Sequence, residues 1–152
     1  MESRTAPDPR LGAVGTDPSE ELPARLLLLS WLVQEHLTAT AAAFGLTHQQ
    51  AWALRILDEP RPMGELAGAM RCDASNVTGI VDRLEKRGLV ERRVDPDDRR
   101  VKRLAVTPAG RALRRRFEER LFSGMPGIEA LGEEEGKRLL RLARKMTPDA
   151  PC

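Results

Sequence analysis

The chain has 152 residues, which is enough for one ordinary domain with short arms. Hydrophobic residues make up 41% of it but aromatic residues only 3%, so its core is built from Leu, Val, Ile and Ala, which favours helices over a β-sandwich or barrel. The net charge of +2 excludes no partner by itself. The uninterrupted apolar runs, of which residues 26–29 are one, are no longer than four residues and too short to span a membrane.

The two ends of the chain are expected to be loose. Residues 1–18 are rich in Pro and poor in apolar side chains, so they bury too little surface to offset the entropy of ordering. Residues 148–152 form a short tail of the same kind. No basic stretch followed by an apolar run opens the chain, so we expect a cytoplasmic location. Cys72 and Cys152 give neither a disulfide framework nor the spacing of a metal site.

A long helix is predicted next, beginning near Pro23 and ending before Gly45, within a first helical segment of residues 19–46. A helix that is apolar on nearly all sides is buried on all sides, and so small a protein cannot cover it alone. We therefore expect a partner chain to cover one side. The apolar residues that lie around this helix are Leu22, Leu26, Leu27, Leu28, Leu29, Trp31, Leu32, Val33 and Leu37.

Three further helices are predicted before the first strand. Thr47 and Gln50 form a capping box that opens the first of them, which ends before Pro60. A short helix runs over residues 64–70, and Asp73 is a suitable N-cap for the helix that follows. The apolar residues of that helix recur at i, i+3, i+4 and i+7 and predict one buried stripe: Val77, Ile80, Val81 and Leu84.

The apolar period changes to about two after Gly88, a residue that suits the left-handed position at a helix end. Residues 89–94 and 101–106 are predicted to be two strands, and the charged, Pro-containing segment between them supplies the turn of a β-hairpin.

Thr107 and Pro108 cap and begin a fifth helix, and a sixth is predicted over residues 133–146. The chain is thus mainly α with a small β-hairpin. A short helix, a tight turn, a second helix and a hairpin are, in that order, the winged helix-turn-helix arrangement, which residues 47–107 would form. Residues 108–147 would be a C-terminal helical segment.

The exposed face of the fourth predicted helix suits the major groove of DNA. Ser75, Asn76 and Thr78 are small hydrogen-bonding residues near its start, and Arg83 is basic further along. Asn pairs with adenine edges, and Ser and Thr pair with bases or phosphates. The alternative is a plain solvated helix face, but such faces usually carry Glu–Lys pairs and not poor helix formers.

The predicted hairpin, with the end of the helix before it, is basic. Residues 82–103 contain nine basic and six acidic side chains, a balance of +3 against +2 for the whole chain. Arg99, Arg100 and Lys102 are therefore candidates for contacts with DNA phosphates and the minor groove. On composition alone, an ordinary charged turn is the better explanation of the hairpin.

Several segments follow one family pattern in the right order and at the right spacing. They are residues 73–92, residues 95–100 followed by 104–110 (Asp-x-Arg, then Leu-Thr-x-x-Gly with Val for the Leu), and Leu46-Thr47 with Gln50. With these motifs, the chain resembles the MarR family of transcription regulators over about residues 22–146. Residues 73–92 are similar to the recognition helix of that family.

The resemblance implies an intertwined homodimer that binds a pseudo-palindromic, double-stranded DNA operator, most often as a repressor. Its interface would be formed by the first, fifth and sixth helices, so that residues 19–46 and 108–147 are the expected dimerisation segments. A small ligand or oxidation would release the operator. The resemblance also implies roles for single residues. These are the major groove for Ser75, Asn76, Thr78 and Arg83, the minor groove for Arg100, and support of the wing arginine or the recognition helix for Asp98.

Other candidate sites have simpler alternatives. Trp31, His36 and Trp52 could line the crevice where relatives bind aromatic acids, so a small aromatic or lipophilic ligand is expected, but core packing explains them as well. Cys72 could sense oxidation, although the sensing cysteine of some relatives lies in the first helix, where this chain has none. A winged-helix module that binds only protein is a further alternative. We expect no metal, no cofactor and no enzyme activity, because neither a Gly-rich phosphate loop nor a nucleophile–base pair is present.

Overall fold

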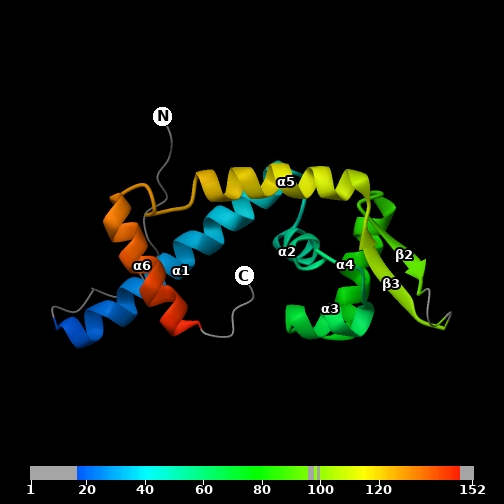
Figure 1. The fold of residues 1–152 in the computed structure, drawn as a ribbon, viewed down its shortest axis with the longest axis horizontal. Coiled ribbons are helices and arrows are strands. Elements are labelled where there is room, and N and C mark those ends of the chain that lie inside the picture. The colour runs from blue at the N-terminus through cyan, green and yellow to red at the C-terminus, as the bar shows by residue number, and fades with distance from the viewer. Residues whose placement is uncertain (1–16, 96–97, 99, 148–152) are drawn as a thin grey trace. The chain divides into compact units, whose positions relative to one another are not determined.

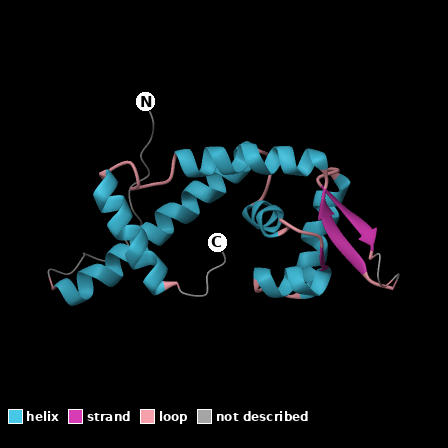
Figure 2. Cartoon of the chain, viewed as in Figure 1, coloured by secondary structure: helices cyan, strands magenta, loops and turns pink. Residues whose placement is uncertain are grey.

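The computed structural model describes residues 17–95, 98 and 100–147, which are mainly helical (Figures 1 and 2). The chain divides into two compact units, residues 1–36 with 124–152 and residues 37–123, which are described separately. None of the helices in the described ranges is long and apolar enough to cross a membrane. The elements in chain order are α1 (Pro18–Ala43), α2 (His48–Ile56), β1 (Arg61–Pro62), α3 (Met63–Met70), α4 (Ala74–Lys86), β2 (Val90–Val94), β3 (Lys102–Val106), α5 (Pro108–Ser123) and α6 (Glu133–Met146).

The unit of residues 37–123 contains a helix-turn-helix motif in which α2, α3 and α4 contact one another. The predicted capping box opens α2: Thr47 Oγ1 accepts the Gln50 N–H at 3.2 Å, and Gln50 Oε1 accepts the Thr47 N–H at 3.0 Å. The predicted apolar stripe of α4 is confirmed, since all four of its residues are buried. One face of α4 is therefore fixed in the core, and the opposite face is left to solvent.

The turn between α3 and α4 is tight. Arg71 has a φ of 50°, a left-handed conformation that Gly adopts at lower cost. The Cys72 N–H donates to the Ala67 carbonyl at 3.2 Å and closes the end of α3. Asp73 occupies the predicted N-cap position of α4, but its side chain makes no capping hydrogen bond, so the prediction is right in position and wrong in mechanism.

The wing is a three-stranded antiparallel sheet in the order β1-β3-β2, not a hairpin alone. β2 and β3 pair along their full length and form the predicted hairpin. The third strand, Arg61–Pro62, pairs with Leu104 and Arg103 of β3. A two-residue strand that ends in Pro has no apolar alternation, so no sequence pattern predicts it. This strand ties the start of α3 to the wing.

Thr107 and Gly110 fix the start of α5 to the end of α4. The Thr107 hydroxyl accepts the Gly110 N–H at 3.0 Å, as expected for an N-cap, and donates to the Gly88 carbonyl at 2.6 Å. Gly88 has the predicted left-handed conformation, with a φ of 67°. A Cβ on Gly110 would lie 2.0 Å from the Leu89 carbonyl oxygen. The close approach of these two backbones therefore requires Gly at position 110.

The other unit starts with α1, which begins at Pro18 and not at the predicted Pro23. The reason is a cap that the sequence analysis missed: Asp17 Oδ1 accepts the Ser19 N–H at 3.0 Å, and this hydrogen bond lowers the pKa of Asp17. Apart from residues 17 and 18, the predicted N-terminal arm lies outside the described residues, as does the tail over residues 148–152.

Apolar side chains of this unit face solvent. Leu22 of α1 and Met146 of α6 are each 64% exposed, and α6, whose predicted bounds are confirmed, has no buried residue. The helices that carry these side chains are regular, so the exposure follows from the sequence and not from local disorder. A surface of this kind is typical of a helix that packs against another chain.

We expect Gly110→Ala to lower the free energy of unfolding by about 1–3 kcal/mol, because the added Cβ forces the Leu89 backbone away from α5. Gly68→Ala is the matched control, since a Cβ there meets no atom within 4 Å. That change should raise stability by up to about 1 kcal/mol through helix propensity. Urea unfolding followed by circular dichroism measures both, and equal stabilities of the two variants would contradict the close approach.

Candidate nucleic-acid interface

The exposed face of α4 brings together the four residues predicted for the major groove. Ser75, Asn76, Thr78 and Arg83 are all exposed, opposite the buried stripe. Asn76 and Arg83 are about two helical turns apart and so lie on one side of the helix. The Thr78 hydroxyl donates to the Ala74 carbonyl at 2.8 Å, which leaves its oxygen as an acceptor for the amino groups of adenine or cytosine.

The wing presents two of its three predicted cations at the surface. Arg100 and Lys102 are exposed, and Arg99 lies outside the described residues. Asp98 Oδ1 accepts the backbone N–H of Arg100 at 2.9 Å, and the Asp98 carbonyl accepts the Val101 N–H at 2.9 Å. Asp98 thus fixes the backbone of the turn that carries Arg100. Its expected support of the wing arginine or the recognition helix stays a prediction.

Arg92 of β2 connects the wing to α4, a role that the sequence analysis missed. Its Nη2 donates to Asp82 Oδ1 at 2.6 Å, and its Nη1 forms an ion pair with Glu85. The hydrogen bond to Asp82, supported by the charge of Glu85, raises the pKa of Arg92 above its ordinary value. The sequence signal that could have predicted these ion pairs was the spacing of Asp82 and Glu85, three residues apart on α4, with an Arg on the next strand. The ion pairs set the orientation of the sheet relative to the exposed face of α4.

Asp95 closes the base of the wing. Asp95 was expected to be one of the charges of the turn, but it is only 4% exposed and forms an ion pair with Arg103 of β3. A buried carboxylate requires such a partner. Two of the nine cations in this stretch, Arg92 and Arg103, therefore hold the wing together. Those at the surface of the described chain include Arg83, Lys86, Arg100 and Lys102.

The three residues predicted for a small ligand belong to both units. Trp31 and His36 are half-buried in the unit of residues 1–36. Trp52, in the other unit, lies 5.4 Å from the Arg55 guanidinium, which is also 5.4 Å from the Phe122 ring. Trp52 is therefore part of a cation–π contact between α2 and α5. It is 39% exposed, so core packing, the alternative explanation, does not hold for this residue.

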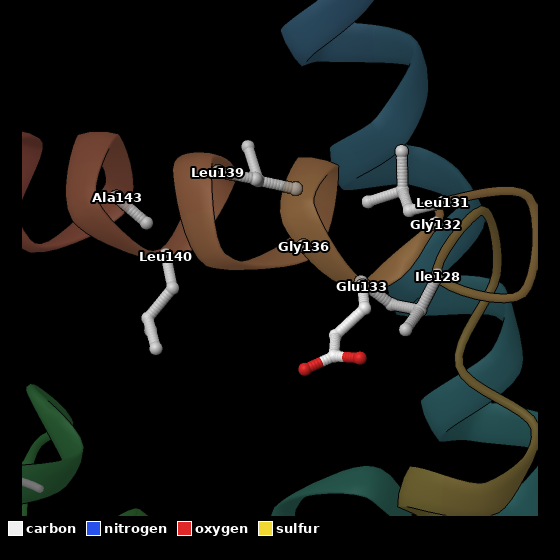
Figure 3. A pocket seen from close by; sticks show the side chains of 8 residues that line it. All are labelled: Ile128, Leu131, Gly132, Glu133, Gly136, Leu139, Leu140 and Ala143. Carbon is white, nitrogen blue, oxygen red and sulfur yellow. The ribbon is translucent and has the colours of Figure 1, made fainter.

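An apolar groove of about 440 Å³ lies along α6, and Figure 3 shows the side chains that line it. The lining residues are Ile128, Leu131, Gly132, Glu133, Gly136, Leu139, Leu140 and Ala143. Leu139 and Leu140 are 41% and 50% exposed, so the groove is open to solvent. The groove was not among the predicted sites, although the apolar pattern of α6 was visible in the sequence.

Within the described residues, no three His, Cys, Asp or Glu side chains are grouped so that they could hold a metal ion. Cys72 is half-buried, and its Sγ lies 3.3 Å from the Met70 carbonyl oxygen. Cys152 lies outside the described part of the chain. The oxidation hypothesis for Cys72 therefore stays a hypothesis.

Comparison with known proteins places this geometry in a family. The MarR family model matches residues 46–102, from the turn before α2 to the start of β3. Residues 46–102 belong to the MarR family. Members of this family are transcription regulators, which agrees with the expectation that the chain is not an enzyme.

Two curated relatives match part of the chain. The HTH-type transcriptional regulator YsmB of Bacillus subtilis (strain 168) is 48% identical over 48 residues, which are 32% of this chain and 33% of YsmB. YcgE of the same organism, also an HTH-type transcriptional regulator, is 43% identical over 72 residues, 46% of each chain. The match thus spans a third of YsmB and less than half of YcgE.

Two solved structures show the likeness over most of the chain. A mutant of S. aureus MepR bound to an oligodeoxyribonucleotide is 22% identical, with a TM-score of 0.61 over 84% of this chain and 96% of MepR. CouR from Rhodococcus jostii RHA1, bound to p-coumaroyl-CoA, is 24% identical, with a TM-score of 0.68 over 91% and 99%. These likenesses confirm the predicted winged helix-turn-helix fold.

We expect Arg92→Gln to lower the free energy of unfolding by about 1 kcal/mol, because it removes both ion pairs between β2 and α4. Arg93→Gln is the matched control: it removes the same charge from the same strand, but Arg93 pairs with Glu91 of β2 itself. We expect that variant to stay within about 0.5 kcal/mol of the wild type. Urea unfolding compares the two, and equal losses would show that the link to α4 contributes nothing.

Proposed function

We propose that this chain is a dimeric, sequence-specific DNA-binding transcription regulator. The observation that carries the proposal is the exposed face of α4. It has small polar residues in its first two turns and Arg83 near its end, opposite a buried apolar stripe. Arg92 holds that face at a set orientation to a wing with exposed cations. This combination is suited to a helix in the major groove and a wing along the backbone and the minor groove.

The predicted residues take distinct roles in this proposal. Ser75, Asn76, Thr78 and Arg83 contact base edges and nearby phosphates from α4. The wing contributes Arg99, Arg100 and Lys102, and Asp98 sets the turn that presents Arg100. The structure of a MepR mutant with an oligodeoxyribonucleotide supports the assignment by analogy of fold. The target is a double-stranded, pseudo-palindromic operator, since a dimer presents two such helices.

The dimer is proposed to form through the unit that contains α6. Its exposed apolar side chains and the groove along α6 present a surface that a second copy of the chain covers. Such an interface belongs to the obligate class, which buries roughly 2,000 Å² or more. Folding and dimerisation are then coupled.

We also propose that the protein is a repressor, and that binding of a small aromatic or lipophilic molecule causes it to dissociate from the operator. CouR, with its bound p-coumaroyl-CoA, supports a ligand of this class. Trp31, His36 and Trp52 remain the candidate contacts. A cytoplasmic location would fit the proposed role, because a regulator of this kind acts where its DNA operator lies.

Light scattering at micromolar concentration tests the dimer. We expect the wild type to have twice the mass of one chain, and Leu140→Glu to weaken self-association at least about tenfold, since it places an unpaired charge in the groove. Arg138→Glu is the control, because Arg138 is exposed on α6 but does not line the groove. A folded wild-type monomer would overturn the proposed dimer.

Salt titrations on two duplexes test the DNA contacts, using an operator selected by the protein from a randomised pool and a scrambled duplex. Asn76→Ala should cost about 1–3 kcal/mol per half-site on the operator and little on the scrambled duplex, because Asn76 faces base edges. Arg100→Ala should weaken both and lower the salt slope by roughly 1 per lost contact, because it meets the backbone and groove.

Both residues are exposed, so neither change should alter folding. If Arg100→Ala spared the scrambled duplex while Asn76→Ala weakened both equally, the roles of wing and helix would be reversed. If the wild type enriched no duplex from the pool, the module that binds only protein would be the better explanation.

A further inference from the structure

Gly79 lies in the middle of α4, on the face that is proposed to enter the major groove. Asn76 is three residues before it and Arg83 four residues after it, so both are its neighbours on the helix surface. A Cβ at Gly79 would meet no atom within 4 Å, and Gly79 is not among the glycines with positive φ. Neither packing nor backbone conformation within the chain therefore requires Gly at this position.

Gly110 and Gly79 differ in the space available for a Cβ atom. At Gly110, an added Cβ would collide with the Leu89 carbonyl oxygen at 2.0 Å, so the fold itself explains the glycine. At Gly79 the fold offers no such reason, and Gly inside a helix costs about 0.5–1 kcal/mol relative to Ala. Gly79 therefore weakens α4 at a position whose neighbours on the helix surface, Asn76 and Arg83, are both proposed to contact bases.

A glycine on a helix surface lets another molecule approach the backbone closely. Every other side chain would hold that molecule away by at least the width of a methyl group. On α4, a closer approach brings the flanking side chains of Asn76 and Arg83 deeper into the groove, where donors and acceptors of the base edges lie. This deeper insertion would strengthen DNA binding only, so the contacts within the free protein do not explain the glycine.

We propose that Gly79 determines specificity by letting the backbone of α4 lie close against the base edges of the operator. This inference rests on the proposed function and adds to it the residue that sets the depth of the recognition helix. It requires that stability and selective binding respond in opposite directions when Gly79 is changed. A residue with a merely structural role would not separate the two.

The test compares the full-length wild type, Gly79→Ala and Gly68→Ala. Gly68 is the control because it lies in a helix of the same motif and, like Gly79, has open space around its Cβ; Gly68 is exposed, whereas Gly79 is half-buried. Urea unfolding should show a higher midpoint for both variants. Anisotropy titration with the duplex selected by the wild type should show at least a tenfold loss for Gly79→Ala, about one lost base contact, and no change for Gly68→Ala.

A scrambled duplex should bind wild type and Gly79→Ala alike, because contacts with the DNA phosphates dominate non-specific binding. Wild-type affinity of Gly79→Ala for the operator would overturn this inference alone, and so would equal losses on both duplexes or an equal loss in Gly68→Ala. Failure of the wild type to select any duplex would overturn the proposed function and this inference with it.

Discussion

Thr107 connects the end of α4, the start of the wing and the first turn of α5 in the unit of residues 37–123. Its hydroxyl donates to the Gly88 carbonyl at the end of α4 and accepts the Gly110 N–H in the first turn of α5, while the Thr107 N–H donates to the Leu89 carbonyl at the start of the wing. Gly110 permits this close approach, because the Cβ of any other residue would lie 2.0 Å from the Leu89 carbonyl oxygen. The Thr-x-x-Gly spacing is therefore a packing requirement that sets where the wing begins after the end of α4.

The charge of the wing has two separate uses, which a balance of +3 does not distinguish. Arg92 and Arg103 are ion-paired with acids on α4 and at the base of the hairpin, so they stabilise the shape of the wing. Exposed cations such as Arg100 and Lys102 remain to interact with phosphates. The salt dependence of DNA binding should therefore follow the exposed cations and not the number of basic residues in the sequence.

Local patterns predicted most of this fold because their causes are local. The capping box of Thr47 and the buried stripe of α4 each depend on residues within two helical turns, and both are present as expected. The features that were missed depend on distance in space. Strand β1 exists only because β3 passes beside it, and the partner of Asp95 comes from the opposite strand of the hairpin. The exposure of the residues proposed to contact DNA could be predicted from periodicity, whereas the ion pairs between α4 and the wing could not.

The composition of α4 shows how a helix can expose residues that form helices poorly. Ser75, Asn76 and Thr78, which are exposed, and Gly79, which is half-buried, are poor helix formers and weaken α4 on its outer side. The inner side compensates, because Val77, Ile80, Val81 and Leu84 are buried and Gly88 ends the helix in a favourable left-handed conformation. Arg92 adds two ion pairs from the neighbouring strand. Since tertiary contacts supply the stability, the outer side need not satisfy helix propensity, and its residues can be suited to the shape and hydrogen-bonding groups of a DNA groove.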